Sequence, residues 1–381
     1  MKRIIYVGMD VHLTSYTVYC VQFELFVEDK IFGHMKLEPT VASVKRYLAK
    51  MTVQLEKAGI SAQFVCGYET GYSGCSLYNE MIAAGLECII LAPSTMKQRP
   101  KHAIKTDKRD AEHIAKCLAY GDYQSVYIPT AEDEQVRDYI RMRNDHHQAL
   151  KKIKQQINAF CLRLGRHFAA GRSNWTQLHL DWLRQLPLDS LNREILGEYL
   201  ITYDAHVTRL AVFDERINEL AAGDRYRERV QQLSCFIGIK THTSLSLLVE
   251  TGDFARFAKA HYFASYLGLN PSEQSSGENI RRGGITKAGN AEMRRLLIEA
   301  AHSIGRGQIG YKSKALKARQ RGNDSKVIAY ADRANERLRR KFYRMIRQGK
   351  RYNVAITAVA RELACFIWGM MTGHFNVRKA S

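Results

Sequence analysis

The first 91 residues alternate between apolar runs and helical spacing in an order that few folds accommodate. Three runs rich in β-branched or aromatic residues come first, followed by an amphipathic stretch, a run, a second amphipathic stretch and a last run. The expected strands are 4–9, 14–23, 31–37, 63–67 and 87–91, and the expected helices are 41–57 and 73–84. This β-β-β-α-β-α-β order predicts a mixed sheet flanked by helices.

Two acidic residues follow strands of this predicted sheet. Asp10 comes at the carboxyl end of the first strand, and Glu69 just beyond the end of the fourth. In α/β sheets, sites collect where strands end and loops begin. Each acid taken alone is better explained as an ordinary turn residue.

A further helix is predicted to begin near Asp107, because Ile114, Ala115 and Leu118 recur on one apolar face. Asp107 and Asp110 are three residues apart, so the first turn would place both carboxylates on one side. A helix N-terminus also favours negative charge, which leaves a purely local role for both acids open.

Four carboxylates that converged without a cation would repel one another and raise each other's pKa. With two Mg²⁺ ions they would form a clamp for the attacking and leaving oxygens of phosphoryl transfer. Three basic residues crowd the same helical turn and would receive a phosphate backbone: Lys105, Lys108 and Arg109. The acids therefore predict a Mg²⁺ site for nucleic-acid chemistry.

Most of the net charge of +20 belongs to one end of the chain. Residues 281–381 contain 24 Lys+Arg and 6 Asp+Glu, whereas residues 1–280 contain 34 and 32. A concentrated positive region is typical of a protein that binds a polyanion, most simply nucleic acid. A ribosome-like or membrane-surface role is the alternative.

Two long helices are predicted in the middle of the chain. Residues 131–166 contain no proline and no glycine before Gly165, and residues 191–222 continue the helical spacing. We interpret the pair as an antiparallel helical or coiled-coil arm that serves oligomerisation.

In the last third of the chain, helical spacing on both sides of a polar stretch predicts helices that flank a loop. A helix, a turn at Gly238 and a second helix come first, and the turn amides would either meet a phosphate or simply pack. A polar, glycine-dotted loop or irregular hairpin follows from 268 onward, and 303–324 reads as a connection. The remaining expected helices are 286–301, 327–347 and 354–371.

The composition favours a folded cytoplasmic protein of two or three domains. The eight cysteines are scattered without metal-binding spacing, as expected of reduced core thiols. We expect no membrane segment, since no apolar run approaches the ~18–20 residues that a span needs. The N-terminus does not fit a signal peptide.

The chain resembles the DEDD-type transposases of bacterial insertion sequences, which are described as bridge-RNA-guided DNA recombinases. The likeness covers nearly the whole length and rests on Gly8-Met9-Asp10, on 68–72 (Tyr-Glu-Thr-Gly-Tyr) and on 105–111 (Lys-Thr-Asp-Lys-Arg-Asp-Ala). It continues at 266–271, 276–277 and 282–290. Each piece is common, but all of them in this order are specific. One departure is Ile237-Gly238-Ile239-Lys240, where the family usually has Pro-Gly-Ile-Gly.

The resemblance implies an α/β plus all-α architecture. It divides the chain into an RNase H/RuvC-like domain (1–130), a coiled-coil helical arm (131–225) and a basic helical C-terminal transposase domain (226–381). It implies Mg²⁺ at Asp10, Glu69, Asp107 and Asp110. It also implies donor and target DNA, a bridge-type guide RNA and a homo-oligomer, either dimer or tetramer, as partners.

The resemblance further implies that the C-terminal domain supplies a nucleophilic serine. Ser276 matches the family's Ser-Gly, and Ser275 is the alternative by adjacency. Such a serine attacks a DNA phosphate and holds the broken strand as a phosphoserine. Arg281 and Arg282 are close enough in sequence to steady the phosphorane. The other expected nucleic-acid contacts of this domain are Lys287, Arg294 and Arg295.

Two other functions stay open at the level of sequence. A Holliday-junction-type nuclease would use the same acids with metal-activated water and no serine. A non-catalytic nucleic-acid binder would use the basic end and leave the acids incidental.

Overall fold

The computed structural model describes residues 3–23, 29–71, 73–97, 106–171, 173–273 and 282–375. The chain separates into two compact units, Met1–Ile128 and Pro129–Ser381. The eight cysteines all lie in the described ranges as thiols, and seven of them are buried, as expected of a reduced protein.

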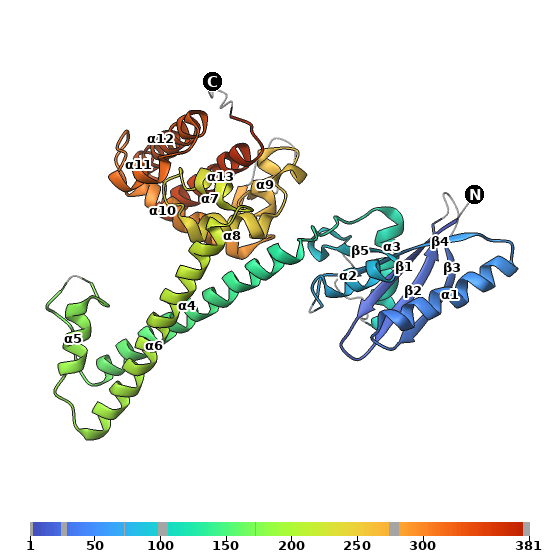
Figure 1. Cartoon of the computed structure of the whole chain (residues 1–381), viewed down its shortest axis with the longest axis horizontal. Coiled ribbons are helices and arrows are strands. Elements are labelled where there is room, and N and C mark those ends of the chain that lie inside the picture. The colour runs from blue at the N-terminus through green and yellow to red at the C-terminus, as the bar shows by residue number, and fades with distance from the viewer. Residues whose placement is uncertain are drawn as a thin grey trace. The chain divides into compact units, whose positions relative to one another are not determined.

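The first unit is a five-stranded mixed sheet with helices on both faces (Figure 1). The strand order is β3-β2-β1-β4-β5. The pairs β3–β2 and β2–β1 are antiparallel, and the pairs β1–β4 and β4–β5 are parallel. The elements are β1 (Arg3–Val11), β2 (Tyr16–Gln22), β3 (Lys30–Leu37), α1 (Val41–Lys57), β4 (Ala62–Glu69), α2 (Ser76–Ala83), β5 (Glu87–Leu91), a short 3-10 helix (Pro93–Thr95) and α3 (Asp107–Tyr120). The predicted mixed sheet flanked by helices is confirmed.

Strand β1 contacts helices on both faces of the sheet, because successive side chains of a strand point to opposite faces. Ile5, Val7 and Met9 have no exposed surface and pack in the layer that contains α1 and α2. Gly8 faces the other layer, where α3 lies. A β-carbon on Gly8 would stand 2.1 Å from the carbonyl oxygen of Ala111 and 2.3 Å from the amide nitrogen of Ala115. The absence of a side chain at this position therefore lets α3 rest on the backbone of β1.

The second unit consists of helices and one short hairpin over the residues that the structure describes. The elements are α4 (Ala131–Arg163), α5 (Gln177–Gln185), α6 (Ser190–Ala222), α7 (Arg227–Leu233), α8 (Thr241–Thr251), a 3-10 helix (Phe254–Arg256), α9 (Ala260–Tyr266), β6 (Pro271–Glu273), β7 (Arg282–Ile285), α10 (Ala291–Gly305), α11 (Lys314–Gln320), α12 (Ser325–Arg347) and α13 (Tyr352–Met371).

Helices α4 and α6 run antiparallel along one another (Figure 1). Near one end of the pair Arg143 makes a bidentate ion pair with Asp214, with N–O distances of 2.8 and 3.1 Å. Farther along, the rings of Phe160 and Tyr199 lie 6.1 Å apart. The two long helices are confirmed, and their role in oligomerisation stays a prediction.

Three stretches differ from the expectation. Helix α5 was not anticipated; Thr176 caps it, and it buries Leu183 against the arm. Helix α10 begins at Ala291 and not at 286, because Lys287 (φ 56°) and Gly289 (φ 81°) adopt left-handed backbone before the Asn290 cap. The expected connection 303–324 contains α11.

Helix α13 is the core helix of the second unit. Leu363, Ala364 and Ile367 are fully buried in its main hydrophobic cluster. Among the described helices it is also the single one that is long enough (20 residues) and apolar enough (mean hydropathy 1.5) to cross a membrane. The expectation that no apolar stretch reaches that length is therefore wrong. Because 61% of its apolar window is buried inside the unit, the apolar character is explained by packing.

Candidate active site

The sheet brings Asp10 and Glu69 to the same edge. Strands β1 and β4 are parallel with Met9 opposite Tyr68, so the next residue of each strand is its neighbour at the carboxyl end. Met9 and Tyr68 are buried in the α1–α2 layer. Because side chains alternate, Asp10 and Glu69 belong to the opposite face, which is the face that α3 covers.

The N-terminus of α3 lies over the carboxyl end of β1. Thr106 caps the helix by accepting a hydrogen bond from the Arg109 amide, and Asp107 and Asp110 follow in the first turn. Ala111 and Ala115 rest on Gly8, two residues before Asp10. The capping threonine and the glycine contact thus bring both helix acids to the strand-end acid.

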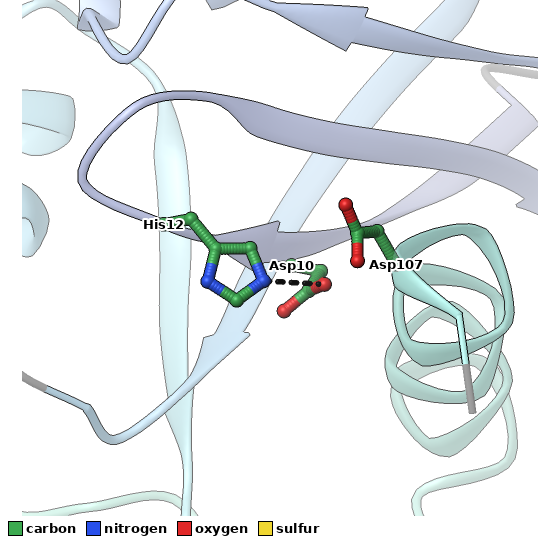
Figure 2. A group of neighbouring side chains, drawn as sticks. All are labelled: Asp10, His12 and Asp107. Carbon is green, nitrogen blue, oxygen red and sulfur yellow. Dashed lines mark hydrogen bonds and ion pairs between the residues drawn. The ribbon is translucent and has the colours of Figure 1, made fainter.

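Asp10, Asp107 and His12 form a compact group in this region, as Figure 2 shows. One ligand atom of each lies within 4.8 Å of those of the other two. His12 Nε2 is 3.2 Å from Asp10 Oδ2. The Asp10 side chain is 17% exposed, whereas those of His12 and Asp107 are 53% and 49% exposed. Solvent therefore reaches the group from the His12 and Asp107 side.

The electrostatics of the group favour a cation. Burial raises the pKa of the Asp10 carboxyl; the nearby His12 opposes this shift, and the Asp110 and Asp107 carboxylates add to it. Carboxylate oxygens are the ligands that hard divalent cations prefer, and imidazole nitrogen suits transition metals. A bound cation would offset the repulsion among the three acids, so these residues fit a divalent metal ion.

An open depression of about 660 Å³ adjoins Asp107. The residues that line it come from β2, β3 and the start of α3: Thr17, His34, Met35, Lys36, Thr106, Asp107 and Lys108. Lys36 Nζ lies 3.8 Å from Asp107 Oδ2. A shallow hollow with two lysines beside carboxylates suits an extended phosphate-bearing chain better than an enclosed small molecule.

The predicted basic contacts fall into four groups. Lys108, Arg109 and Lys287 are exposed. Arg294 donates to the Leu267 carbonyl at 2.8 Å, and Arg295 pairs with Glu292 and Glu299, so both serve the packing of α10. The backbone of Arg282 belongs to β7. The others lie outside the described residues: Lys105 and Arg281, together with the two serines Ser275 and Ser276.

Both ends of the hairpin that carries the serine segment are held by asparagines. Asn270 precedes β6, and its side-chain oxygen accepts a hydrogen bond from Arg361 Nε at 2.7 Å. Asn290 follows β7 and donates to Glu250 Oε2 at 2.8 Å, and Arg141 of α4 binds the same carboxylate at 2.9 Å. These anchors were not predicted. The asparagines at the two ends of the C-terminal motif were the only sequence signal for them.

The turn at Gly238 is used for packing. Gly238 has φ 83°, and a β-carbon there would lie 2.4 Å from the carbonyl oxygen of Ala300. The Ile237 amide donates to Asn335 Oδ1 at 2.9 Å. Of the two roles open to the turn, the structure supports close packing against α10 and α12.

Known proteins similar to this chain are transposases. The pattern of the transposase IS116/IS110/IS902 family matches residues 230–318, and that of the IS110-type DEDD transposases matches residues 7–164. The putative transposase y4qE of Sinorhizobium fredii is 31% identical over 365 residues, which cover 96% of this chain and 88% of that protein. The chain belongs to the IS110-type transposase family.

Two further transposases show the same relationship. The transposase for insertion sequence element IS1533 of Leptospira borgpetersenii is 31% identical over 90% of this chain and 96% of its own. The transposase for insertion sequence element IS1111A of Coxiella burnetii is 26% identical over 302 residues, which cover 76% of this chain and 79% of that protein. A solved RuvC from T. thermophilus, in complex with a Holliday junction substrate, aligns with 32% of this chain and 99% of its own at 12% identity; its TM-score of 0.22 is too low to support a statement about fold.

This transposase is therefore an enzyme that acts on DNA by cutting and rejoining strands. The family's four-acid signature implies use of a divalent metal, and the group around Asp10 is the acidic cluster available for it. The hypothesis of a non-catalytic binder is set aside on these grounds.

Proposed function

We propose that this insertion-sequence transposase cuts and rejoins DNA through a covalent phosphoserine on Ser276, with Mg²⁺ held by Asp10, Glu69, Asp107 and Asp110. The observation that carries the proposal is the position of the first turn of α3, whose acids lie beside Asp10 on one face of the sheet. Family membership supports the assignment of these acids to metal binding.

An RNase H/RuvC-like fold for the first domain is part of the proposal. The mixed sheet with β1 at its centre and acids at the strand ends supports it. The division into 1–130, 131–225 and 226–381 is likewise proposed; the structure itself separates units at Ile128.

The proposal assigns two chemical roles, metal binding to the four carboxylates and nucleophilic attack to Ser276. The four carboxylates would hold Mg²⁺, which when bound neutralises phosphate charge and polarises the reacting P–O bonds. The Oγ of Ser276 would form a bond to phosphorus while the bond from phosphorus to one strand breaks, and that strand's oxygen takes a proton. Rejoining is the reverse with a different strand end, so no energy is lost to hydrolysis.

The basic helix α12 is the surface that we assign to nucleic acid. Five arginines recur on it at helical spacing, which puts them on one face: Arg333, Arg337, Arg340, Arg344 and Arg347. Arg337 pairs with Glu362. Arg340, Arg344 and Arg347 are exposed toward the end of the helix, and Arg340 also pairs with Glu336 one turn earlier. Donor and target DNA and a bridge-type guide RNA are the proposed partners, with a homo-oligomer acting in the cytoplasm.

The test is the trapping of the covalent intermediate. Ser276→Ala is expected to bind DNA and RNA normally, because the hydroxyl adds little to contacts made by Lys and Arg, yet to form no adduct and no recombinant. Ser275→Ala is the matched control and is expected to be mild. Mapping the DNA-bearing peptide to Ser275, or normal recombination by Ser276→Ala, would refute the assignment.

The Holliday-junction-type nuclease remains the second candidate function. The depression beside Asp107 favours it as much as it favours the recombinase, since either would admit a phosphate backbone. Metal-dependent strand cutting by Ser276→Ala without any protein–DNA adduct would support that function.

A further inference from the structure

We propose that His12 is a ligand of the metal ion held by Asp10 and Asp107, so that this site has a mixed nitrogen–oxygen ligand set and favours Mn²⁺ over Mg²⁺ more than a purely carboxylate site would. The inference rests on the metal site of the proposed function. It adds a residue that the four-acid signature does not contain.

The local backbone directs His12 toward Asp10. His12 is the first residue after β1 and follows Asp10 by two positions, and its imidazole lies on the same side of the chain as the Asp10 carboxylate, 3.2 Å from it. The chain then turns tightly, and the His12 amide donates to the Ser15 carbonyl at 3.0 Å. Figure 2 shows the imidazole directed at the Asp10 carboxylate, with Asp107 approaching from the start of α3.

The spacing of the donor atoms suits shared coordination. An ion bound octahedrally at ~2.1 Å places adjacent ligand atoms about 3.0 Å apart and opposite ones about 4.2 Å apart. His12 Nε2 and Asp10 Oδ2 are separated by 3.2 Å, close to the first of these values. All three donor atoms lie within 4.8 Å of one another, so a small side-chain rotation is enough for the Asp107 carboxylate to bind the same ion.

Packing does not explain the position of His12. Its side chain is 53% exposed, so it contributes little to the core. An exposed ion pair with Asp10 would add little stability, because solvent screens it. The alternative role is to orient the Asp10 carboxylate by a hydrogen bond alone, and metal-binding measurements separate the two roles.

A nitrogen ligand changes which divalent metal ion the site binds more tightly. Mg²⁺ is bound almost wholly through oxygen. Imidazole is a ligand of first-row transition metals, and Mn²⁺ is the member of that series whose preference for oxygen ligands is most like that of Mg²⁺. Removing the imidazole should therefore weaken Mn²⁺ binding more than Mg²⁺ binding. The ratio of the two affinities is the quantity that reports on His12.

The experiment uses the full-length protein and Mn²⁺ as a spectroscopic probe. Electron paramagnetic resonance titrations would give the Mn²⁺ affinity, and competition would give that of Mg²⁺. For His12→Gln we expect Mn²⁺ binding weakened at least about tenfold and a smaller loss for Mg²⁺. Electron spin-echo modulation from a directly bound ¹⁴N should be present in the wild type and lost in His12→Gln. His167→Gln, an exposed histidine of the second unit, is the control and should leave both readouts unchanged.

Each contrary result has a defined meaning. Unchanged Mn²⁺ affinity in His12→Gln, or wild-type Mn²⁺ bound without ¹⁴N modulation, would overturn the proposal, the latter by assigning His12 to orientation of Asp10. Asp10→Asn tests the metal site itself. If Asp10→Asn loses Mn²⁺ while His12→Gln does not, only this inference fails; if neither variant changes binding, the proposed metal site fails as well.

Discussion

Asp10 is the residue on which the candidate site depends most directly. It is the most shielded of the three grouped side chains, and burial together with Asp110 and Asp107 raises the pKa of its carboxyl. A carboxylate kept among other carboxylates costs stability unless a cation joins them. The arrangement is consequently one that function and not folding explains.

The helix acids should be required for cutting and dispensable for folding. Asp107→Asn or Asp110→Asn is expected to abolish strand cleavage in the presence of Mg²⁺, because each removes a charged oxygen ligand. The circular dichroism spectrum and melting temperature should stay near those of the wild type. Asp122→Asn, an exposed acid just after the same helix, should cleave normally. Full recombination by either helix variant would contradict the metal assignment.

A second residue-scale prediction concerns the base of the arm. Burial alone would raise the pKa of Asp133, but bidentate hydrogen bonds from Arg225 (2.7 and 2.9 Å) and one from the Tyr226 hydroxyl (2.5 Å) hold it below the ordinary value. A lowered pKa in the folded state contributes stability that is present above the unfolded pKa and lost as the pH falls.

Asp133→Asn should therefore destabilise the protein by about 2 kcal/mol at neutral pH. The difference from the wild type should shrink as the pH falls below the ordinary carboxyl range, since the wild type loses the same charge. Chemical denaturation at a series of pH values would measure it. A difference that does not depend on pH would show that altered packing, and not charge, is responsible.

At the scale of elements, the contact between α3 and β1 determines where the acids meet. Ala111 and Ala115 touch the backbone at Gly8, and the helix then presents its first turn at the strand's carboxyl end.

Gly8→Ala should displace α3 and disable the site. The added β-carbon would meet backbone atoms at 2.1 and 2.3 Å, and backbone cannot swing aside as a side chain can. We expect a loss of about 1–3 kcal/mol in the free energy of unfolding, with weakened metal binding. Gly67→Ala is the matched control on β4, because the atoms nearest to its β-carbon are side-chain ends of Leu118 and Leu91 and not backbone. Equal effects of the two substitutions would contradict this account.

The elements were predictable where periodicity alone determines them. The succession of strands and helices along the first unit, and the start of α3 at Asp107, follow from apolar spacing. The start of α10 was not predictable, because the left-handed backbone at Lys287 results from pairing with Gly268, whose carbonyl accepts its amide at 3.1 Å. His12 was not predicted as a site residue, because a single exposed histidine gives no periodic pattern in the sequence. Its place in the candidate site follows from its 3.2 Å distance to Asp10.

At the scale of the whole molecule, charge is distributed unevenly along the chain. The last 101 residues carry 24 of the 58 Lys+Arg but only 6 of the 38 Asp+Glu. Some of these cations serve the fold, as Lys341 and Arg337 do in binding Glu362. The exposed remainder is available for phosphate.

Neutralising the exposed end of α12 should weaken nucleic-acid binding generally. The triple variant Arg340→Gln, Arg344→Gln, Arg347→Gln is expected to bind both DNA and RNA less tightly. The slope of log K against log salt should fall by roughly 1 for each phosphate that the variant no longer neutralises. The control with equal charge change on α1, Arg46→Gln, Lys50→Gln, Lys57→Gln, should bind as the wild type does. An unchanged slope in the α12 variant would assign phosphate binding to another surface.

The glycine on the central strand has a consequence for how such a gene can change over generations. The spacing between the strand acid and the helix acids is set by the thickness of two polypeptide backbones, which is the same whatever the neighbouring side chains are. Substitutions among Ile5, Val7 and Met9 alter the volume of the opposite layer only. The interior of this unit can therefore change in sequence while the spacing of the candidate metal site stays the same.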